Sequence, residues 1–294
     1  MLLNKRISVL FFLDAIKKDL IVVILYAFII GFADQYAFLS KIEVPIAITS
    51  SLGTAVVLLL AFRINQSYER WWEARSIWGA VVNDSRTLVR QMQSFSSGNT
   101  PDGFVNKLAE RQSVWCYALG EHLRKLSWSS RVQAYIQKEK IKEDHLPNAL
   151  LSAHSLQIKE AYTMGYINSY QQVQLDSTIA RLCDAMGKCE RIKSTVFPKS
   201  YSLLIHFIIY VFATLLPFGL DDKYIAVEIG LTILIPSVFI AIEKTSILMQ
   251  DPFENLPLDT PMTALATTIE RNIRSMTGEP EMHIIQQNDA YYQL

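Results

Sequence analysis

The stretch VPIAITSSLGTAVVLLLAF, residues 44–62, decides the fold class because it contains no charged side chain. At about 1.5 Å per residue, a helix of this length crosses most of the roughly 30 Å hydrocarbon core of a bilayer. Residues 20–33 and 200–220 also lack Asp, Glu, Lys and Arg, and 224–242 contain only Glu228. Buried helices of a large soluble protein normally keep a polar face, which 44–62 and 200–220 do not. The sequence therefore predicts an all-α membrane protein with four transmembrane helices in a lipid bilayer.

The composition of the whole chain agrees with this class. Of 294 residues, 28 are Lys or Arg and 28 are Asp or Glu, so the formal net charge is zero, and 19% are charged whereas 50% are hydrophobic. A dedicated nucleic-acid binder needs a basic surplus, so no nucleic-acid partner is expected. The 5 Trp, 13 Tyr and 14 Phe residues exclude intrinsic disorder. Three cysteines without a C-x-x-C pair indicate reduced thiols.

Basic residues lie at one end of each predicted hairpin of spans. Four precede the first span, and others follow the second and precede the third, whereas each short hairpin turn holds a single Lys. The positive-inside rule therefore makes both termini and the central segment cytoplasmic. The predicted segments are an amphipathic lead-in (1–19), transmembrane helices 1 and 2 (20–62), a helical cytoplasmic domain (63–199), transmembrane helices 3 and 4 (200–242) and a cytoplasmic C-terminal segment with its tail (243–294).

Helical periodicity continues outside the predicted spans. Apolar residues at helical spacing predict one long helix over 65–95 that continues from the second span. Further helices are expected over 104–126, 130–142, 148–164, 167–193 and from Thr260 or Thr263 to about Met276. Residues 63–199 carry 19 basic and 13 acidic side chains, whereas 200–294 carry 4 and 11. These opposite surpluses predict that the acidic C-terminal segment lies against the basic central body, either of its own chain or of a neighbouring copy.

Signatures of catalysis are absent from the sequence. The five histidines show neither H-x-x-x-H nor H-E-x-x-H spacing, and the chain has no phosphate-binding glycine loop and no nucleophile elbow. We therefore expect no metal site, no catalytic residue and no cofactor, and the chain is not expected to be an enzyme. His206 lies within the third predicted span, either as a proton-relay or ion-path residue or as a hydrogen-bonded histidine near one interface.

Three residues of the second span point to transport. Thr54, Leu58 and Phe62 lie at i, i+4 and i+8, on one face of the predicted helix. Gln66 and Arg70 are expected to extend the same face into the cytoplasm. If copies of this helix surrounded an axis, the three side chains would form a narrow apolar neck, which gates ions by dewetting and leads to a polar vestibule. The same spacing is also ordinary helix packing, and periodicity alone leaves both interpretations open.

Several motifs resemble the bestrophin family, and its bacterial members in particular. The longest is AFRINQSYERWWEAR at 61–75, followed by Trp78-Gly79. The others are DSRTLVR (84–90), GKCERI (187–192), TLLPF (214–218), DPFEN (251–255), LPL (256–258) and TIERN (268–272). They occur in the family's order from about residue 4 to 277, so the resemblance covers nearly the whole chain.

The resemblance implies a homopentameric channel with one central pore, in a bacterial inner membrane, that conducts ions passively. The family's neck positions fall on Thr54, Leu58 and Phe62; Thr54 departs from the usual Ile or Phe and would make the outer neck wetter. A cytoplasmic constriction falls near Val173, with Tyr170 as the competing assignment. Anions such as chloride are the favoured permeant ions. A cation (sodium) channel, a non-conducting scaffold, and a membrane enzyme or carrier are the alternatives.

The resemblance also bears on calcium. Animal bestrophins sense calcium through an acidic cluster just after the Pro-Phe of the C-terminal segment. Here the corresponding carboxylates are Asp251, Glu254 and Asp259, separated by uncharged residues. Calcium takes six to eight oxygen ligands, and three spaced carboxylates supply few of them. We therefore expect no activation by calcium.

Overall fold

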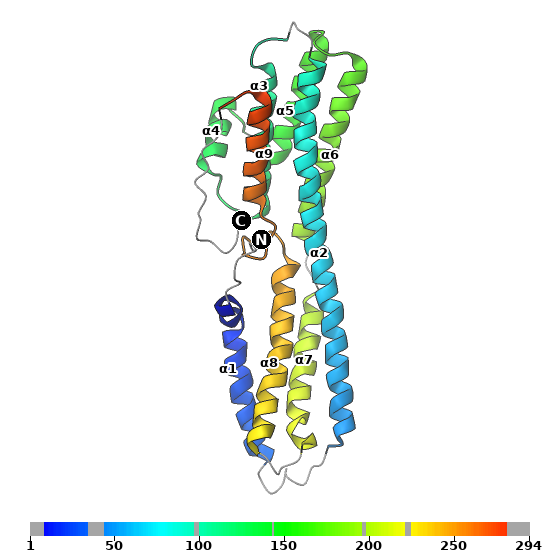
Figure 1. Ribbon diagram of the computed structural model, residues 1–294, viewed down its shortest axis with the longest axis vertical. Helices are drawn as coiled ribbons and strands as arrows, with labels where there is room; N and C mark the ends of the chain where they lie inside the picture. The colour runs from blue at the N-terminus through cyan, green and yellow to red at the C-terminus, as the bar shows by residue number, and fades with distance from the viewer. Residues whose placement is uncertain are drawn as a thin grey trace. The chain divides into compact units, whose positions relative to one another are not determined.

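The computed structural model describes residues 9–34, 44–96, 100–142, 144–195, 198–220 and 225–280, and every regular element in these ranges is helical (Figure 1). The elements are α1 (Val9–Asp34), α2 (Ile46–Phe95), α3 (Phe104–Leu123), α4 (Ser130–Glu139), α5 (Leu146–Thr163), α6 (Ser169–Ser194), α7 (Lys199–Leu215), the 3-10 turn η1 (Pro217–Gly219), α8 (Ile225–Gln250) and α9 (Met262–Thr277). The all-α class predicted from the sequence is confirmed.

The chain divides into two compact units. The apolar unit comprises the described residues from α1 to Arg70 and from α7 to Asp251; the polar unit comprises those from Trp71 to Thr195 and from Pro252 onward. The continuous helix α2 contributes to both, as predicted for the second span and residues 65–95. The predicted segment boundaries at 62/63, 199/200 and 242/243 mark ends of apolar stretches rather than of packing units, and they remain predictions.

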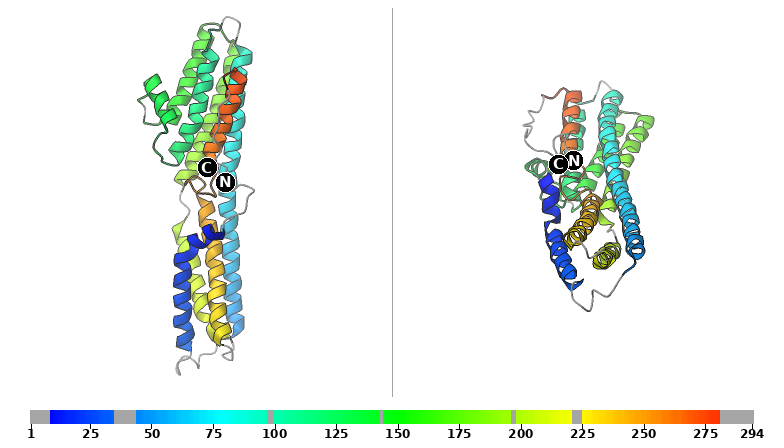
Figure 2. Two further views of the ribbon diagram at one scale, coloured as in Figure 1. Left: turned by 60° about the vertical axis from the view of Figure 1, so that its left-hand side comes forward. Right: turned by 60° about the horizontal axis from the view of Figure 1, so that its bottom comes forward.

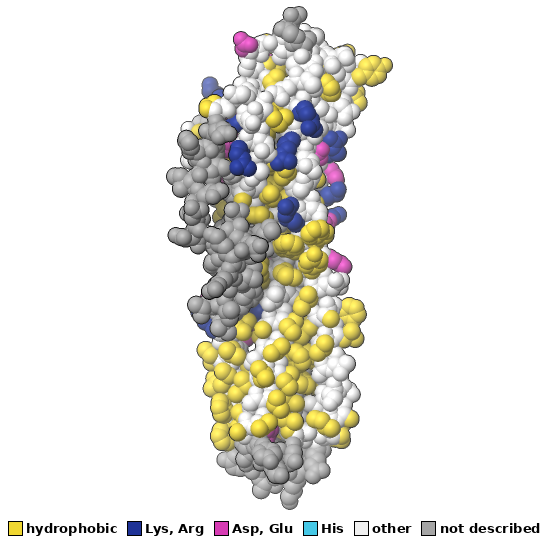
Figure 3. All heavy atoms as spheres, in the orientation of Figure 1, with side chains coloured by type: hydrophobic (Ala, Val, Ile, Leu, Met, Phe, Trp, Pro, Cys, Tyr) yellow, Lys and Arg dark blue, Asp and Glu magenta, His cyan; other side chains and the backbone are white. Residues whose placement is uncertain are grey.

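In the apolar unit, α8 packs against both α1 and α7 (Figures 1 and 2). A small core fills the space between the helices: Val23, Val56, Leu60, Ile205, Ile209, Phe212, Leu216, Phe239 and Ile240. Many other large apolar side chains point outward, among them Leu25, Phe32, Leu203, Phe207 and Leu234. Hydrophobic side chains therefore cover most of the visible face of this unit (Figure 3), as expected where the surrounding solvent is lipid.

The helices of the apolar unit differ from the predicted spans at their ends. Two described helices, Ile46–Phe95 and Ala226–Gln250, are long and apolar enough to cross a membrane by length and composition, and Ser200–Leu215 is a shorter apolar helix. The third predicted span, 200–220, ends its α-helix at Leu215, and Pro217, which has no amide hydrogen to donate, begins a 3-10 turn. Conversely, α1 begins within the predicted lead-in, and α8 continues eight residues beyond the predicted end at Ile242.

The polar unit has the larger core, built around the fully buried indoles of Trp78 and Trp115. Helix α3 packs against both α5 and α9, and α5 packs against α6. The helices predicted at 104–126, 130–142, 148–164 and 167–193 are confirmed as α3 to α6, with ends shifted by up to three residues. The predicted C-terminal helix is confirmed as α9.

Ion pairs and hydrogen bonds attach the C-terminal segment to the rest of the polar unit. Arg131 pairs with Glu270 of α9, and Lys193 Nζ lies 2.5 Å from Glu254 Oε1. Arg124 Nη1 donates to Thr263 Oγ1 at 2.6 Å. The acidic segment therefore lies against the basic body of its own chain, which is one of the two arrangements that the charge distribution leaves open.

Candidate functional site

One face of the first half of α2 packs against the rest of the apolar unit. Its buried positions are Thr49, Val56, Leu60, Arg63 and Ser67. The first two are two helical turns apart and the others follow at steps of three or four residues, so all five lie on one side of the helix. The tightest approach is at Gly53, where a Cβ would lie 3.0 Å from the ring of Phe212 in α7. Tyr201 of α7 also donates its hydroxyl to the Leu59 carbonyl at 3.2 Å. These contacts fix the rotation of α2 about its axis.

The three predicted neck residues lie on the opposite face of α2. Thr54 is exposed, and the exposed fractions of Leu58 and Phe62 are 56% and 57%, against 2% for Leu60. At about 100° per residue, these positions point away from the packed stripe. The result is an uncharged stripe along α2 that no helix of the same chain covers among the described residues.

The Thr54 side chain presents less polar surface to its surroundings than a free hydroxyl would. Its hydroxyl donates to the Ser50 carbonyl one turn earlier at 2.9 Å, a common arrangement for Thr within an apolar helix. Ser50 and Ser51 use their hydroxyls in the same way, each at 2.7 Å. Since these donors are satisfied within the helix, only acceptor lone pairs face outward, and the outer end of the stripe is moderately rather than strongly polar.

A polar contact with α8 begins at the residue after Phe62. Arg63 is buried and donates from Nη2 to Gln250 Oε1 at 3.2 Å. One turn on, the hydroxyls of Ser67 and Ser246 lie 2.9 Å apart, and Arg70 Nε donates to the Gln250 carbonyl at 2.9 Å. The sequence did not mark Arg63 or Ser67 as functional. Its assignment of Arg70 to the face of the predicted neck is wrong, because the Arg70 guanidinium bonds to α8 on the packed side. The signal was available, because 63, 67 and 70 repeat at helical spacing on the face opposite the predicted neck.

Comparison with known proteins decides the family. The family model described as "Bacterial/Fungal Bestrophin protein" matches residues 6–275. This chain belongs to the bacterial bestrophin family. The resemblance inferred from the sequence motifs is therefore confirmed, and the chain is a membrane protein.

Curated relatives and solved structures agree with this assignment. A voltage-dependent anion channel-forming protein of Ralstonia nicotianae is 28% identical over 79% of this chain and 78% of its own length. The voltage-dependent anion channel-forming protein YneE of Escherichia coli is 28% identical over 86% of this chain and 84% of its own. The crystal structure of a bacterial bestrophin homolog from Klebsiella pneumoniae is 27% identical, with a TM-score of 0.81 over 90% of this chain and 99% of that one. Because the family is a channel-forming one, the prediction that the chain is not an enzyme is confirmed.

Tyr170 and Val173, the two candidates for the cytoplasmic constriction, lie in the first turns of α6 in this bestrophin. Both side chains protrude from the chain, with exposed fractions of 87% and 70%. The start of α6 is fixed by a capping box, in which Asn168 Oδ1 accepts from the Gln171 amide and Gln171 Oε1 accepts from the Asn168 amide. Both side chains therefore project outward from a well-fixed helix start. The assignment of the constriction to Val173, or to Tyr170, remains a prediction.

His206 has an acidic partner that the sequence did not reveal. Its Nδ1 lies 3.1 Å from Glu243 Oε2, and the Glu243 carboxylate is buried. The same nitrogen lies 3.2 Å from the Ser202 carbonyl. Because Glu243 follows the predicted fourth span, periodicity within the spans could not pair it with His206. The bonding agrees with a hydrogen-bonded histidine, and a relay role is untested.

The three carboxylates considered for calcium each have partners within their own unit. Asp251 lies 3.7 Å from Arg70 Nη2, and Glu254 pairs with Lys193. Asp259 is buried, with its Oδ2 accepting from the Leu256 amide at 3.1 Å. Burial raises the pKa of the Asp259 carboxyl to about 6. An inward-facing carboxylate that accepts backbone amides is poorly placed to bind a calcium ion from solvent.

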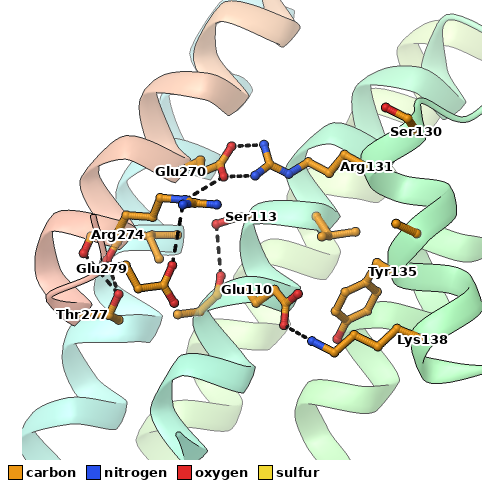
Figure 4. A pocket seen from close by; sticks show the side chains of 14 residues that line it. Glu110, Ser113, Ser130, Arg131, Tyr135, Lys138, Glu270, Arg274, Thr277 and Glu279 are labelled. Carbon is orange, nitrogen blue, oxygen red and sulfur yellow. Dashed lines mark hydrogen bonds and ion pairs between the residues drawn. The ribbon is translucent and has the colours of Figure 1, made fainter. Parts of the chain in front are cut away.

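A cavity of about 440 Å³ lies between α3, α4 and α9 of the polar unit (Figure 4). Glu270 lines it, and its buried carboxylate is bound by both Arg131 and Arg274. At its other side Lys138 pairs with Glu110 at 2.6 Å. The cationic and acidic groups that line the cavity are paired with one another, so its charges support α9 rather than a ligand.

Two of the three cysteine thiols of this bestrophin are buried. Burial raises the pKa of the Cys116 and Cys189 thiols to about 12, so neither forms a thiolate at neutral pH. Cys183 is exposed, and all three cysteines are free.

Proposed function

We propose that this bestrophin is a passive anion channel, assembled as a homopentamer around one central pore that α2 lines. The observation that carries the proposal is the uncharged, uncovered stripe of Thr54, Leu58 and Phe62 on the face of α2 opposite its packed face. In a single chain this stripe would expose apolar surface along a helix that also carries the family's longest motif. Symmetric copies would turn it into the narrow neck of a pore.

The proposed neck gates by dewetting, because an uncharged constriction opposes ions of either sign until water enters it. The sign of the conducted ion must therefore come from elsewhere along the path. Curated relatives are named anion channel-forming proteins, and residues 63–199 carry 19 basic against 13 acidic side chains. Both observations support anions such as chloride. Val173, or Tyr170 in its place, forms the second constriction of the proposed pathway.

The proposed location is the bacterial inner membrane, with α1, the first part of α2, α7 and α8 as four spans and both termini in the cytoplasm. The excess of Lys and Arg outside the short hairpin turns supports this orientation. Cysteine accessibility tests it. A thiol introduced in the hairpin turn at Ser40 should react with an impermeant reagent from the periplasm, and the exposed native Cys183 should not.

Reconstitution in liposomes under a salt gradient tests the ion and the pore together. An anion channel gives a reversal potential close to the chloride equilibrium potential, and replacing chloride by a large organic anion abolishes the current. A reversal near the sodium potential would instead establish the cation channel of the same fold. If an intact pentamer gave no current, the non-conducting scaffold would be the remaining function. Cross-linking in the membrane, with five bands as the expected ladder, tests the assembly separately.

A further inference from the structure

Three metal-ligating side chains converge in the polar unit, away from the proposed pore residues. His122 lies in the last turn of α3, His145 is the N-cap of α5, and Glu190 lies on α6. One nitrogen from each imidazole and one oxygen of the carboxylate all lie within 4.8 Å of one another. No local sequence spacing reveals the group, because the two histidines are 23 positions apart in the sequence and Glu190 follows His145 by 45 positions.

The geometry is centred on a single oxygen. Glu190 Oε1 lies 2.9 Å from His145 Nε2 and 4.0 Å from His122 Nε2. The two rings are adjacent, with centroids 4.6 Å apart. Ligand atoms around a tetrahedral zinc ion lie about 3.3 Å apart, given bonds of about 2.0 to 2.1 Å. Each pair of the cluster is within about 1.5 Å of that spacing, and small rotations of half-buried side chains close the difference.

We propose that His122, His145 and Glu190 form a binding site for Zn²⁺ or a similar transition-metal ion, with a fourth position open to water. Two imidazoles and one carboxylate are a common ligand set for zinc, whereas calcium and magnesium prefer oxygen ligands alone. All three side chains are one third to two fifths exposed, so an ion can reach them from solvent. Such an ion would cross-link α3, α5 and α6.

Binding would alter the start of α5. His145 Nδ1 accepts from the Asn148 amide at 3.2 Å, so in the metal-free protein the ring proton lies on Nε2 and points to Glu190. A metal on Nε2 requires that this proton move to Nδ1. The N-cap hydrogen bond to Asn148 is then lost, and the site exchanges one backbone contact for a coordination bond. This exchange lowers the metal affinity relative to that of a fully preformed site. It also gives metal binding a measurable signature, the loss of the hydrogen bond from the Asn148 amide.

The test is a Zn²⁺ titration of the purified full-length protein, without a histidine tag, against a competing chelator. We expect one ion per chain, and an affinity reduced by at least about tenfold in His122→Gln, His145→Asn and Glu190→Gln. His145→Asn is the sharpest variant, because Asn is among the best N-cap residues and so removes the ligand while keeping the cap. Glu160→Gln, an exposed carboxylate elsewhere on α5, is the matched control and should bind as the parent does.

Two further readouts exclude a merely structural effect of the substitutions. Co²⁺ bound to the parent should give the intense visible absorption of a tetrahedral site, and this should disappear in His145→Asn. Hydrogen exchange at the Asn148 amide should accelerate when Zn²⁺ is added to the parent and not in His145→Asn. Unchanged zinc affinity in the three ligand variants, or no saturable binding by the parent, overturns the proposal. Because no readout involves ion flux, the result is independent of the channel proposal.

Discussion

Leu58 and Leu60 are the same residue type, two positions apart on α2, and the proposed pore assigns them opposite roles. Leu58 is 56% exposed on the uncovered stripe, and Leu60 is 2% exposed among α7 and α8. Leu58→Ala and Leu60→Ala therefore remove the same atoms from two different environments. Comparison of the two variants separates a pore-lining effect from a packing effect.

The expected magnitudes follow from burial. Leu60→Ala leaves a cavity in the core of the apolar unit and should cost about 2 kcal/mol. This is the low end of the range for buried leucines, because lipid-embedded helices gain no hydrophobic transfer term on packing. Such a loss lowers the folded-to-unfolded ratio about 30-fold. Leu58→Ala removes a side chain that its own chain leaves uncovered, so the expected loss of stability within the subunit is below about 0.5 kcal/mol.

For chloride flux the order of the two variants should be reversed, so that Leu58→Ala has the large effect and Leu60→Ala the small one. With one Leu58 per subunit in the ring, Leu58→Ala widens the neck at every subunit and should increase flux several-fold by lowering the barrier to wetting. Leu60→Ala should leave flux per folded channel unchanged. The assay is liposome flux normalised to reconstituted pentamer, with unfolding followed in detergent. Equal flux in Leu58→Ala and the parent, or an increase in Leu60→Ala alone, would refute the assignment of the stripe to the neck.

Four further predictions concern other parts of the chain. Thr54→Val keeps the shape of the side chain but removes its outward lone pairs, so liposome flux should fall, and equal flux would show that this position is not in the neck. Purified channels should conduct equally with calcium and with a calcium chelator, and a steep calcium dependence would contradict this. The Asp259 pKa is raised to about 6 in the folded state, so folding stability should decrease as pH rises from about 4 to 6, by up to about 3 kcal/mol; melting curves of Asp259→Asn should lack this slope. Glu270→Gln leaves Arg131 and Arg274 without their shared carboxylate and should lower the free energy of unfolding by about 2 to 3 kcal/mol. This is less than the roughly 3 to 5 kcal/mol of a fully buried pair, because both guanidiniums reach water. Glu254→Gln, which removes the exposed pair with Lys193, is the control and should cost less than about 1 kcal/mol by thermal unfolding.

The sequence determined the class, the helices and the family of this protein. An uncharged run such as 44–62 needs no tertiary information to be interpreted, because lipid compatibility depends on composition over a fixed length. Helical periodicity is equally local, and so the continuous α2 and the helices α3 to α6 were predictable to within a few residues. The face of α2 that holds Leu58 and Phe62 could be drawn from periodicity, but whether it was the packed or the uncovered face could not.

Tertiary structure decided what lies opposite what. The burial of Leu60 and Arg63 shows that the other face of α2 is the packed one, and this depends on α7 and α8, which follow more than a hundred residues later. The pairing of His206 with Glu243 and the convergence of His122, His145 and Glu190 depend in the same way on helices distant in sequence. Short-range spacing rules see only partners within a turn or two of the same helix. Clusters assembled from separate helices exist only once those helices pack.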